Sequence, residues 1–167
     1  MEFREAKEKF LQTWGALGSH WGINKTMAQI HALLMVSPDS LSMEEVMEDL
    51  NISRGNASMN LRALIDWGLI FKEYKSGERR EYFRAEQDID QLARKIAIER
   101  SKREIKPTLR VLEDVQSIES DGSKESRQFK TKTKELYEFV SKADTMLEKI
   151  VNQKENWITK TIFKLMS

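Results

Sequence analysis

The sequence predicts a mainly α-helical chain with one small β-hairpin, arranged as a winged helix-turn-helix with helical dimerisation arms. Three observations predict this fold. The 167 residues include only two prolines and seven glycines, so little interrupts the helical spacing of apolar residues. Two short helical patterns stand on either side of a turn near residue 51. After residue 68 the apolar spacing changes from helix-like to strand-like.

The first two helices are expected over residues 2–20 and 24–37. In the first, aromatic and aliphatic residues recur at helical spacing between lysines and glutamates, which is typical of an amphipathic helix. In the second, Asn24 is a residue type that caps helix N-termini, and Pro38 is expected to end the helix.

A helix-turn-helix follows these two helices. In LSMEEVMEDL, Ser42 followed three residues later by Glu45 has the pattern of a capping box at the start of a third helix. The turn is expected at residues 51–52. Ser53 then caps a fourth helix, and Gly68 stands where a helix end favours a left-handed residue.

The second half of the chain begins with a hairpin and continues as helix. Residues 69–75 and 79–85 are rich in aromatic and β-branched residues and read as two strands around a Ser-Gly turn. A long helical region is expected from 88 to 119, which Pro107 should kink or divide. After a polar break, a further helix is expected over 124–152.

These elements suggest three parts of the chain. Residues 1–22 form an N-terminal helix used in dimerisation, 23–86 a winged helix-turn-helix domain that binds DNA, and 87–167 a helical dimerisation region.

The fourth helix is expected to have two different faces. Its apolar residues, such as Leu61 and Leu64, follow a period near 3.6 and should face the core. In a helix-turn-helix the second helix enters the major groove, where Asn can pair with adenine and Arg with guanine or a phosphate. The predicted DNA-binding residues on the outer face are Ser53, Arg54, Asn56, Ser58, Asn60 and Arg62.

The hairpin adds a second predicted DNA contact. Lys75, Arg79 and Arg80 surround its turn and are expected to reach the DNA backbone or the minor groove. The net charge of the whole chain is only +1, so the electrostatic case for a nucleic-acid partner has to be local. Between residues 53 and 84 there are seven Lys or Arg and four Asp or Glu, a local balance of +3.

The helical arms carry apolar stripes that a small winged helix cannot bury alone. An a/d pattern of the coiled-coil type runs from Phe129 to Ile150. We therefore predict a homodimer, with packing of these stripes within one chain as the alternative. The predicted dimerisation residues are Phe10, Trp14, Leu136, Val140, Leu147 and Ile150.

Nothing in the sequence points to catalysis. There is no Cys, only two His are present, and no nucleophile-elbow, phosphate-loop or zinc-protease motif occurs. We expect no enzymatic activity, no cofactor and no metal. No apolar run is long enough to span a bilayer, and the N-terminus lacks a signal-peptide pattern, so a cytoplasmic protein is expected.

Tryptophans offer a possible effector site. Aromatic faces attract quaternary ammonium groups, so Trp14, Trp21 and Trp67 could line a pocket for a small cationic molecule. The alternative role of all three is packing in the core.

Residues 22–84 resemble the winged helix of MarR-type transcriptional regulators, and in particular the GbsR branch. The resemblance lies in WGINKTMAQIHALL, LNISRGNASMNLRALIDWGLI and GERREYF, and it continues through DIDQLARKIAIERSKREIKPTLRVL. It implies a dimeric repressor or activator acting on double-stranded DNA, and some relatives respond to choline or betaine-like osmolytes. The positions that match the recognition helix and the wing are Ser53, Arg54, Asn56, Ser58, Asn60, Arg79 and Arg80.

Together these observations favour a sequence-specific DNA-binding transcriptional regulator, with repression as the preferred direction. The alternative is a winged-helix protein-interaction module that does not bind DNA. A basic hairpin argues against this alternative, and the near-neutral net charge argues for it.

Overall fold

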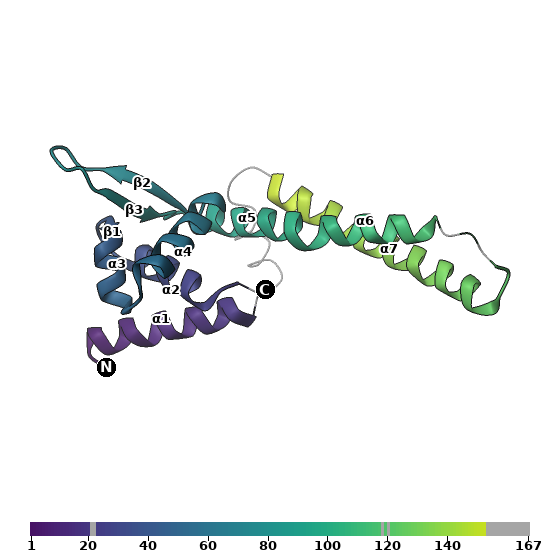
Figure 1. Ribbon diagram of the computed structural model, residues 1–167, viewed down its shortest axis with the longest axis horizontal. Helices are drawn as coiled ribbons and strands as arrows, with labels where there is room; N and C mark the ends of the chain where they lie inside the picture. Colours follow the sequence, from purple (N-terminus) through teal and green to yellow (C-terminus); the bar gives the residue numbers. More distant parts are fainter. Residues whose placement is uncertain (21–22, 118, 120, 153–167) are drawn as a thin grey trace, which may run out of the picture. The chain divides into compact units, whose positions relative to one another are not determined.

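The computed structural model describes residues 1–20, 23–117, 119 and 121–152 (Figure 1). The chain divides into two compact units, Met1–Leu92 and Ala93–Ser167. The elements of the first unit are α1 (Phe3–His20), α2 (Lys25–Val36), β1 (Leu41–Ser42), α3 (Met43–Leu50), α4 (Arg54–Asp66), β2 (Ile70–Tyr74) and β3 (Glu81–Ala85). The later elements are α5 (Ile89–Arg100), which begins before the division, the π-helical turn η1 (Ser101–Ile105), α6 (Lys106–Gln116) and α7 (Lys124–Asn152).

The helix caps predicted from the sequence are present. The Asn24 side-chain oxygen accepts a hydrogen bond from the Thr26 N–H at 2.8 Å. Ser42 and Glu45 form the complete capping box, and hydrogen bonds from the Ser42 backbone and hydroxyl hold the pKa of Glu45 below its ordinary value. Gly68 has the left-handed backbone, with φ of 68°, that the end of α4 requires.

The core of the first unit is built around α2. Ile30, Leu33 and Leu34 are at most 1% exposed, and α2 packs against α1, α4 and β3. Glycine lets α1 come close to α2, because a Cβ atom added at Gly18 would lie only 2.5 Å from the Cβ of Ala28. This close packing holds α1 and α2 together, and α3 and α4 in turn pack against α2.

The wing is part of a three-stranded antiparallel sheet in the order β1-β3-β2 (Figure 1). The expectation of a two-stranded hairpin alone was therefore incomplete. Leu41 pairs with Phe83 and Ser42 with Tyr82, so the base of the wing is joined to the start of α3. A two-residue strand is too short to show any alternation of apolar residues, so β1 was not predicted.

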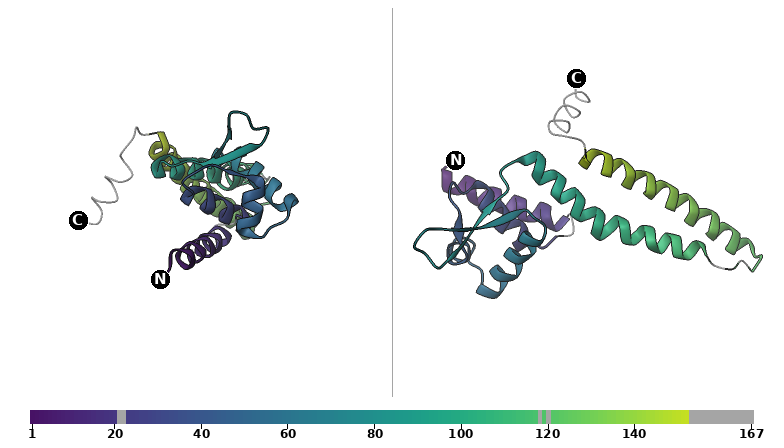
Figure 2. Two further views of the ribbon diagram at one scale, coloured as in Figure 1. Left: turned by 90° about the vertical axis from the view of Figure 1, so that its left-hand side faces the viewer. Right: turned by 90° about the horizontal axis from the view of Figure 1, so that it is seen from above.

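In the second unit, one long helical rod runs beside α7 (Figures 1 and 2). The rod changes to a π-helical turn just before Pro107, which lies in the first turn of α6. Pro107 has no N–H to donate to the preceding turn, so the predicted interruption occurs there. The helix predicted over 124–152 is confirmed as α7.

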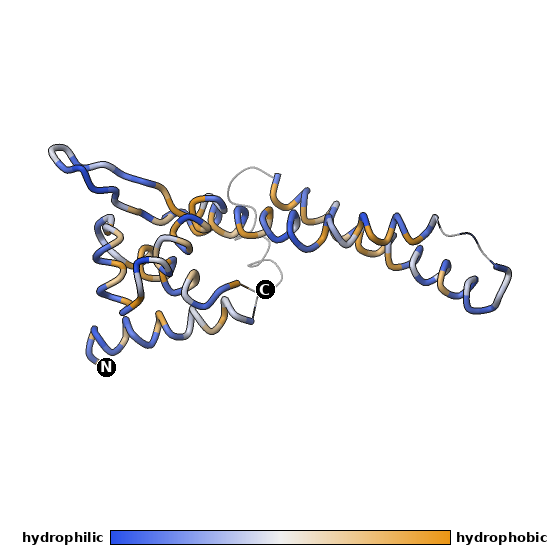
Figure 3. The backbone as a smooth tube through the Cα atoms, in the orientation of Figure 1, coloured by the Kyte–Doolittle hydropathy of each residue, from blue (hydrophilic) through white to orange (hydrophobic). Residues whose placement is uncertain are grey.

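Polar contacts connect the rod to α7. The Ser101 hydroxyl donates to Asp144 at 2.7 Å, and the Lys106 ammonium group pairs with Glu148 at 2.9 Å. Apolar and polar residues alternate along both helices (Figure 3). None of the helices in the described parts of the chain combines the length and the apolar character needed to cross a membrane.

The residues of the predicted a/d stripe of α7 differ in how far they are buried. Val140, Leu147 and Ile150 are partly buried within the second unit. Leu136 is 52% exposed, and beside it on the same helix Phe139 is 72% exposed. The stripe therefore serves partly as packing within the chain, which was the alternative role, and partly remains uncovered.

Candidate nucleic-acid interface

Helix α4 begins as the sequence predicted. The Ser53 side-chain oxygen caps the helix by accepting from the Asn56 N–H at 3.3 Å. Ala57, Leu61 and Leu64 are 0–2% exposed and pack α4 onto the rest of the first unit. The inner face of the predicted recognition helix is thus confirmed.

The other side of α4 is open. Arg54 and Arg62 are exposed, and Ser58 is partly exposed. A Cβ atom added at Gly55 would have no neighbour within 4 Å, so this turn of the helix faces free space. Met59, which is 60% exposed, adds an apolar side chain to the same accessible region. Gly55 and Ser58 are small, so this part of the helix could approach a duplex closely between the longer side chains.

Asn60 does not lie on the exposed outer face where it was predicted. It is 2% exposed, and its Nδ2 group donates to the backbone oxygen and to Oδ1 of Asn56. The i,i+4 spacing brings the two amides together within the helix. Burial removes Asn60 from direct reach of a duplex and places it behind Asn56, which is partly exposed.

Several cations near α4 and the wing are already paired with carboxylates. Arg54 pairs with Glu44 of α3 at 2.6 Å. Lys72 pairs with Glu81 across the wing at 2.8 Å. The hydrogen bond between them raises the pKa of Lys72 and lowers the pKa of Glu81, so both groups are charged at neutral pH.

Three arginines of this region have no carboxylate partner within the described residues. Across the part of the chain that the structure describes, Arg62, Arg79 and Arg80 form no ion pair with a carboxylate. They come from α4 and from the wing, the two elements that the sequence singled out. The local excess of positive charge is therefore presented mainly by these three guanidinium groups.

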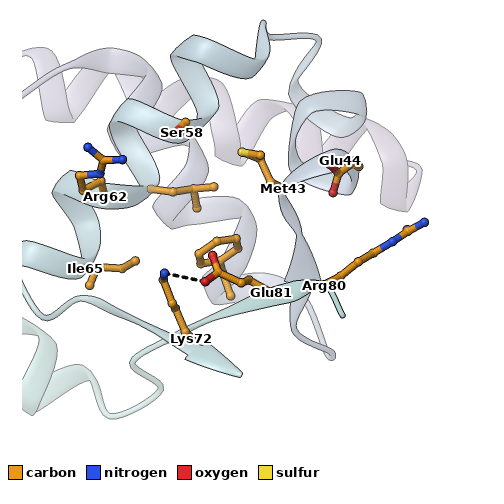
Figure 4. Close-up of a pocket in the computed structure, with 10 residues that line it drawn as sticks. Met43, Glu44, Ser58, Arg62, Ile65, Lys72, Arg80 and Glu81 are labelled. Carbon is orange, nitrogen blue, oxygen red and sulfur yellow. Dashed lines mark hydrogen bonds and ion pairs between the residues drawn. The ribbon is translucent and has the colours of Figure 1, made fainter. Parts of the chain in front are cut away.

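A hollow of about 320 Å³ lies between α4, the start of α3 and the wing (Figure 4). Figure 4 shows Arg62 and Lys72 at its rim, whereas Arg80 extends away from the wing. Glu44 and Glu81 also line it, so the hollow carries both positive and negative groups. The complete lining is Met43, Glu44, Ser58, Leu61, Arg62, Ile65, Lys72, Arg80, Glu81 and Phe83.

The tip of the wing folds back onto its own strand. Gly77 takes a φ of 82°, which allows the tight turn. The Lys75 ammonium group lies 3.9 Å from the centre of the Tyr82 ring, and the Tyr82 hydroxyl donates to Glu78. That hydrogen bond raises the pKa of Tyr82. Lys75 was predicted as a DNA contact, and its position over the ring makes it less available than the arginines beyond it.

The predicted tryptophan pocket stays a prediction. Trp14 is partly buried and its ring centre lies 5.6 Å from that of Phe10. Trp67 is the C-cap of α4 and is also partly buried. Trp21 lies outside the described residues. Neither Trp14 nor Trp67 lines the hollow beside α4.

Sequence reasoning missed the two carboxylates of the site. Glu44 is ten residues from Arg54, across a turn, and no short spacing rule connects them. Glu81 could have been found from the hairpin register: Glu81 pairs with Tyr74, two residues from Lys72, so Lys72 and Glu81 are diagonal neighbours on one face.

No protein-family model matches the chain, and no curated protein matches it. Solved structures do. One described as a transcriptional regulator matches with a TM-score of 0.67, 20% sequence identity, and coverage of 87% of this chain and 95% of that chain. A mutant of S. aureus MepR bound to an oligodeoxyribonucleotide matches with a TM-score of 0.42, 16% identity, and coverage of 83% and 94%. A MarR transcriptional regulator from Methanosarcina mazei Go1 matches with a TM-score of 0.40, 17% identity, and coverage of 83% and 94%. The first likeness shows a shared fold.

Proposed function

We propose that this chain is a sequence-specific regulator of transcription that binds double-stranded DNA as a homodimer in the cytoplasm, most simply as a repressor. The observation that carries the proposal is the exposed edge of α4 beside a wing whose Arg79 and Arg80 form no ion pair within the described residues. The solved structure with the same fold is described as a transcriptional regulator, which supports the same reading.

The first turns of α4 suit the major groove. The chain's own packing uses the opposite face of the helix, so the exposed edge is free for base contacts. Arg54, Asn56 and Ser58 stand near the helix N-terminus, which also favours a phosphate because its N–H groups carry partial positive charge. In this proposal these residues contact bases or the adjoining backbone, and Asn60 supports Asn56 from behind.

The three arginines without a carboxylate partner would supply most of the DNA affinity that does not depend on base sequence. A duplex that binds Arg62, Arg79 and Arg80 releases counterions without first breaking an ion pair. Arg54 differs, because a phosphate must compete with Glu44 for it. We therefore expect Arg54 to contribute less to affinity than its position at the start of α4 suggests.

The dimer part of the proposal rests on uncovered apolar surface in the predicted dimerisation region, residues 87–167. Leu136, Phe139 and Met146 are 52–72% exposed on α7. A second copy that covered this face would give the assembly two α4 helices, the number that a site with paired half-sites requires. Phe10 and Trp14 of the N-terminal region 1–22 remain proposed contributors, since both are only partly buried.

The proposal is tested with duplexes selected from random DNA and a triple variant, Arg62→Ala with Arg79→Ala and Arg80→Ala. We expect weaker binding to every sequence and a shallower dependence of log K on log salt. Each lost phosphate contact should reduce the slope by about 0.9, which gives about 5 for a dimer. Fluorescence anisotropy across a salt series measures both quantities.

A matched control removes the same charge elsewhere: Lys9→Ala with Arg110→Ala and Lys134→Ala. All three side chains are exposed, and within the described residues none forms an ion pair. If both triple variants changed binding equally, the wing and α4 would have no special role. If the unaltered protein bound no duplex at low salt, the alternative of a protein-interaction module would replace this proposal.

The finer placement in the GbsR branch, with a cationic effector, stands on the sequence resemblance alone. A titration with choline or betaine at millimolar concentration would test it through tryptophan fluorescence. A Trp14→Phe variant separates this site from the other tryptophans. Unchanged fluorescence in the unaltered protein would remove the proposed effector pocket and leave DNA binding unaffected.

A further inference from the structure

The side-chain amides of Asn56 and Asn60 form a pair in the first two turns of α4. The Nδ2 group of Asn60 lies 2.8 Å from the backbone oxygen of Asn56 and 2.7 Å from its Oδ1. Asn60 is 2% exposed and Asn56 is partly exposed. Both residues belong to one helix, so the pair is formed in the free protein and does not need a ligand.

Hydrogen-bond chemistry fixes which atom of each amide is which. A backbone carbonyl only accepts, so the Asn60 atom beside the Asn56 carbonyl has to be the NH₂ group. An NH₂ group only donates, so the Asn56 atom beside it has to be the oxygen. The remaining atom of the Asn56 amide is therefore its own NH₂ group. Among the described residues this group has no acceptor.

We propose that Asn60 is a positioning residue that holds Asn56 with its NH₂ donor available to a base edge, so that at one position of its site α4 favours a base with a major-groove acceptor over cytosine. This inference rests on the proposed function and deepens it. In the major groove guanine offers N7 and O6 as acceptors, adenine offers N7 and thymine offers O4, whereas cytosine offers only a donor. The Asn60 amide takes one of the two lone pairs of Asn56 Oδ1 and holds that oxygen toward Asn60, which disfavours the two-bond pairing of Asn56 with adenine.

A purely structural role for Asn60 makes a different prediction. In that case Asn60 would only satisfy its own buried amide, and its removal would weaken binding to all sequences by the same factor. The positioning role instead changes the preference at a single base pair and leaves the others unchanged. It also requires that the effect of Asn60 pass through Asn56.

The test uses the full chain, selection from random duplex DNA, and four proteins: unaltered, Asn56→Ala, Asn60→Ala and the double variant. We expect the unaltered protein to prefer guanine or thymine over cytosine about tenfold at one position, the size of one hydrogen bond to a base. Asn60→Ala should reduce this preference to less than about threefold, a residual that unrestrained Asn56 can retain. The double variant should be no worse than Asn56→Ala.

A second variant keeps the test independent of changes in the core. Residue 56 is partly exposed, so a charged side chain is tolerated there. Asn56→Asp keeps an acceptor for Asn60 but has no donor left. The base preference should therefore move toward cytosine, whose N4 group donates. Thermal unfolding of each variant checks that it is folded.

Several results would overturn the inference. These are an unchanged base preference in Asn60→Ala, a uniform loss of affinity in that variant, or effects of the two single alanine variants that add in the double variant. If the unaltered protein bound no DNA, both the proposed function and this inference would be wrong. If it bound DNA but Asn60→Ala kept the preference, only the positioning role would fall.

Discussion

The first unit has a core of fully buried apolar side chains, whereas the described apolar side chains of the helical hairpin of α6 and α7 are exposed or only partly buried. Among the described residues, every hydrophobic side chain classed as buried lies between Leu11 and Leu92. From Ala93 onward the buried side chains are those of Ser101 and Thr133, both polar. Helices in water draw most of their stability from packing an apolar face. This difference among the described residues is the basis of the proposed dimer, in which a second copy covers the exposed face of α7.

The largest expected effect comes from placing charge on the exposed face of α7. Leu136→Asp together with Phe139→Asp should separate the proposed dimer, because a carboxylate buried at the interface without a partner costs about 3–5 kcal/mol. The dissociation constant should rise more than a hundredfold, measured by sedimentation equilibrium.

The matched control for this variant is Lys134→Asp, an exposed residue two positions before Leu136. Successive helical residues are 100° apart, so Lys134 faces away from Leu136. The control should remain a dimer. A double variant that stayed dimeric would show that this face of α7 does not form the interface, and the comparison between the two units would need another explanation.

A core substitution in the first unit should act independently of protein concentration. Ile30→Ala removes a side chain that is 0% exposed and should lower the free energy of unfolding by about 2–5 kcal/mol. A change on the exposed face of α7, Met146→Ala, should instead alter unfolding by an amount that depends on protein concentration, because Met146 is 68% exposed and would lie in the proposed dimer interface. Urea denaturation at several protein concentrations distinguishes the two, and identical behaviour would contradict the proposed difference.

His31 gives the first unit a pH dependence that comes from a buried histidine, and no histidine lies between Ala93 and Asn152. Burial lowers the pKa of His31 from 6.5 to about 4. Between these values the unfolded chain binds a proton that the folded chain excludes. Stability that is fully present above pH 6.5 is therefore lost as the pH falls toward 4, by about 3 kcal/mol. Chemical denaturation from pH 4 to pH 7 measures this loss.

A variant that removes the buried imidazole should flatten this profile. His31→Leu replaces it with an apolar side chain, and its stability should vary less over the same pH range. His20 is exposed, so His20→Gln should retain the unaltered dependence. An unaltered protein with constant stability between pH 4 and pH 7 would show that His31 is solvated or leaves the core.

The smallest expected effect concerns the ion pair between Lys106 and Glu148. Both side chains are about half exposed, at 45% and 53%. A double-mutant cycle with alanine at both positions should give a coupling of less than about 1 kcal/mol. A coupling several times larger would mean that polar contacts alone hold the hairpin, and would weaken the case for a partner.

Local signals carried most of what could be predicted. Asn24, Ser42 with Glu45, and Ser53 cap helices through contacts two or three residues away, so the sequence is sufficient to place them. Gly68 marks the end of α4 for an equally local reason, its left-handed backbone. The helix boundaries and the wing followed from these residues together with apolar spacing.

Contacts between distant parts of the chain were not predictable in the same way. Strand β1 exists because Leu41 meets Phe83, more than forty residues later. Arg54 was assigned to DNA without its partner Glu44, which comes from the other side of a turn. Asn60 was placed outside because it is polar, yet a neighbour four residues earlier satisfies its amide and allows burial.

Ser42 belongs to two structures at the same time. It pairs with Tyr82 at the base of the wing, and its hydroxyl and backbone N–H complete the first turn of α3. The strands of the wing therefore cannot pivot without tilting the helix-turn-helix with them. Only the six residues between the paired strands, 75–80, can adjust on their own. In the proposed function, a duplex whose groove width does not suit this frame would have to bend to fit the protein, and the stiffness of the DNA itself would then contribute to selection.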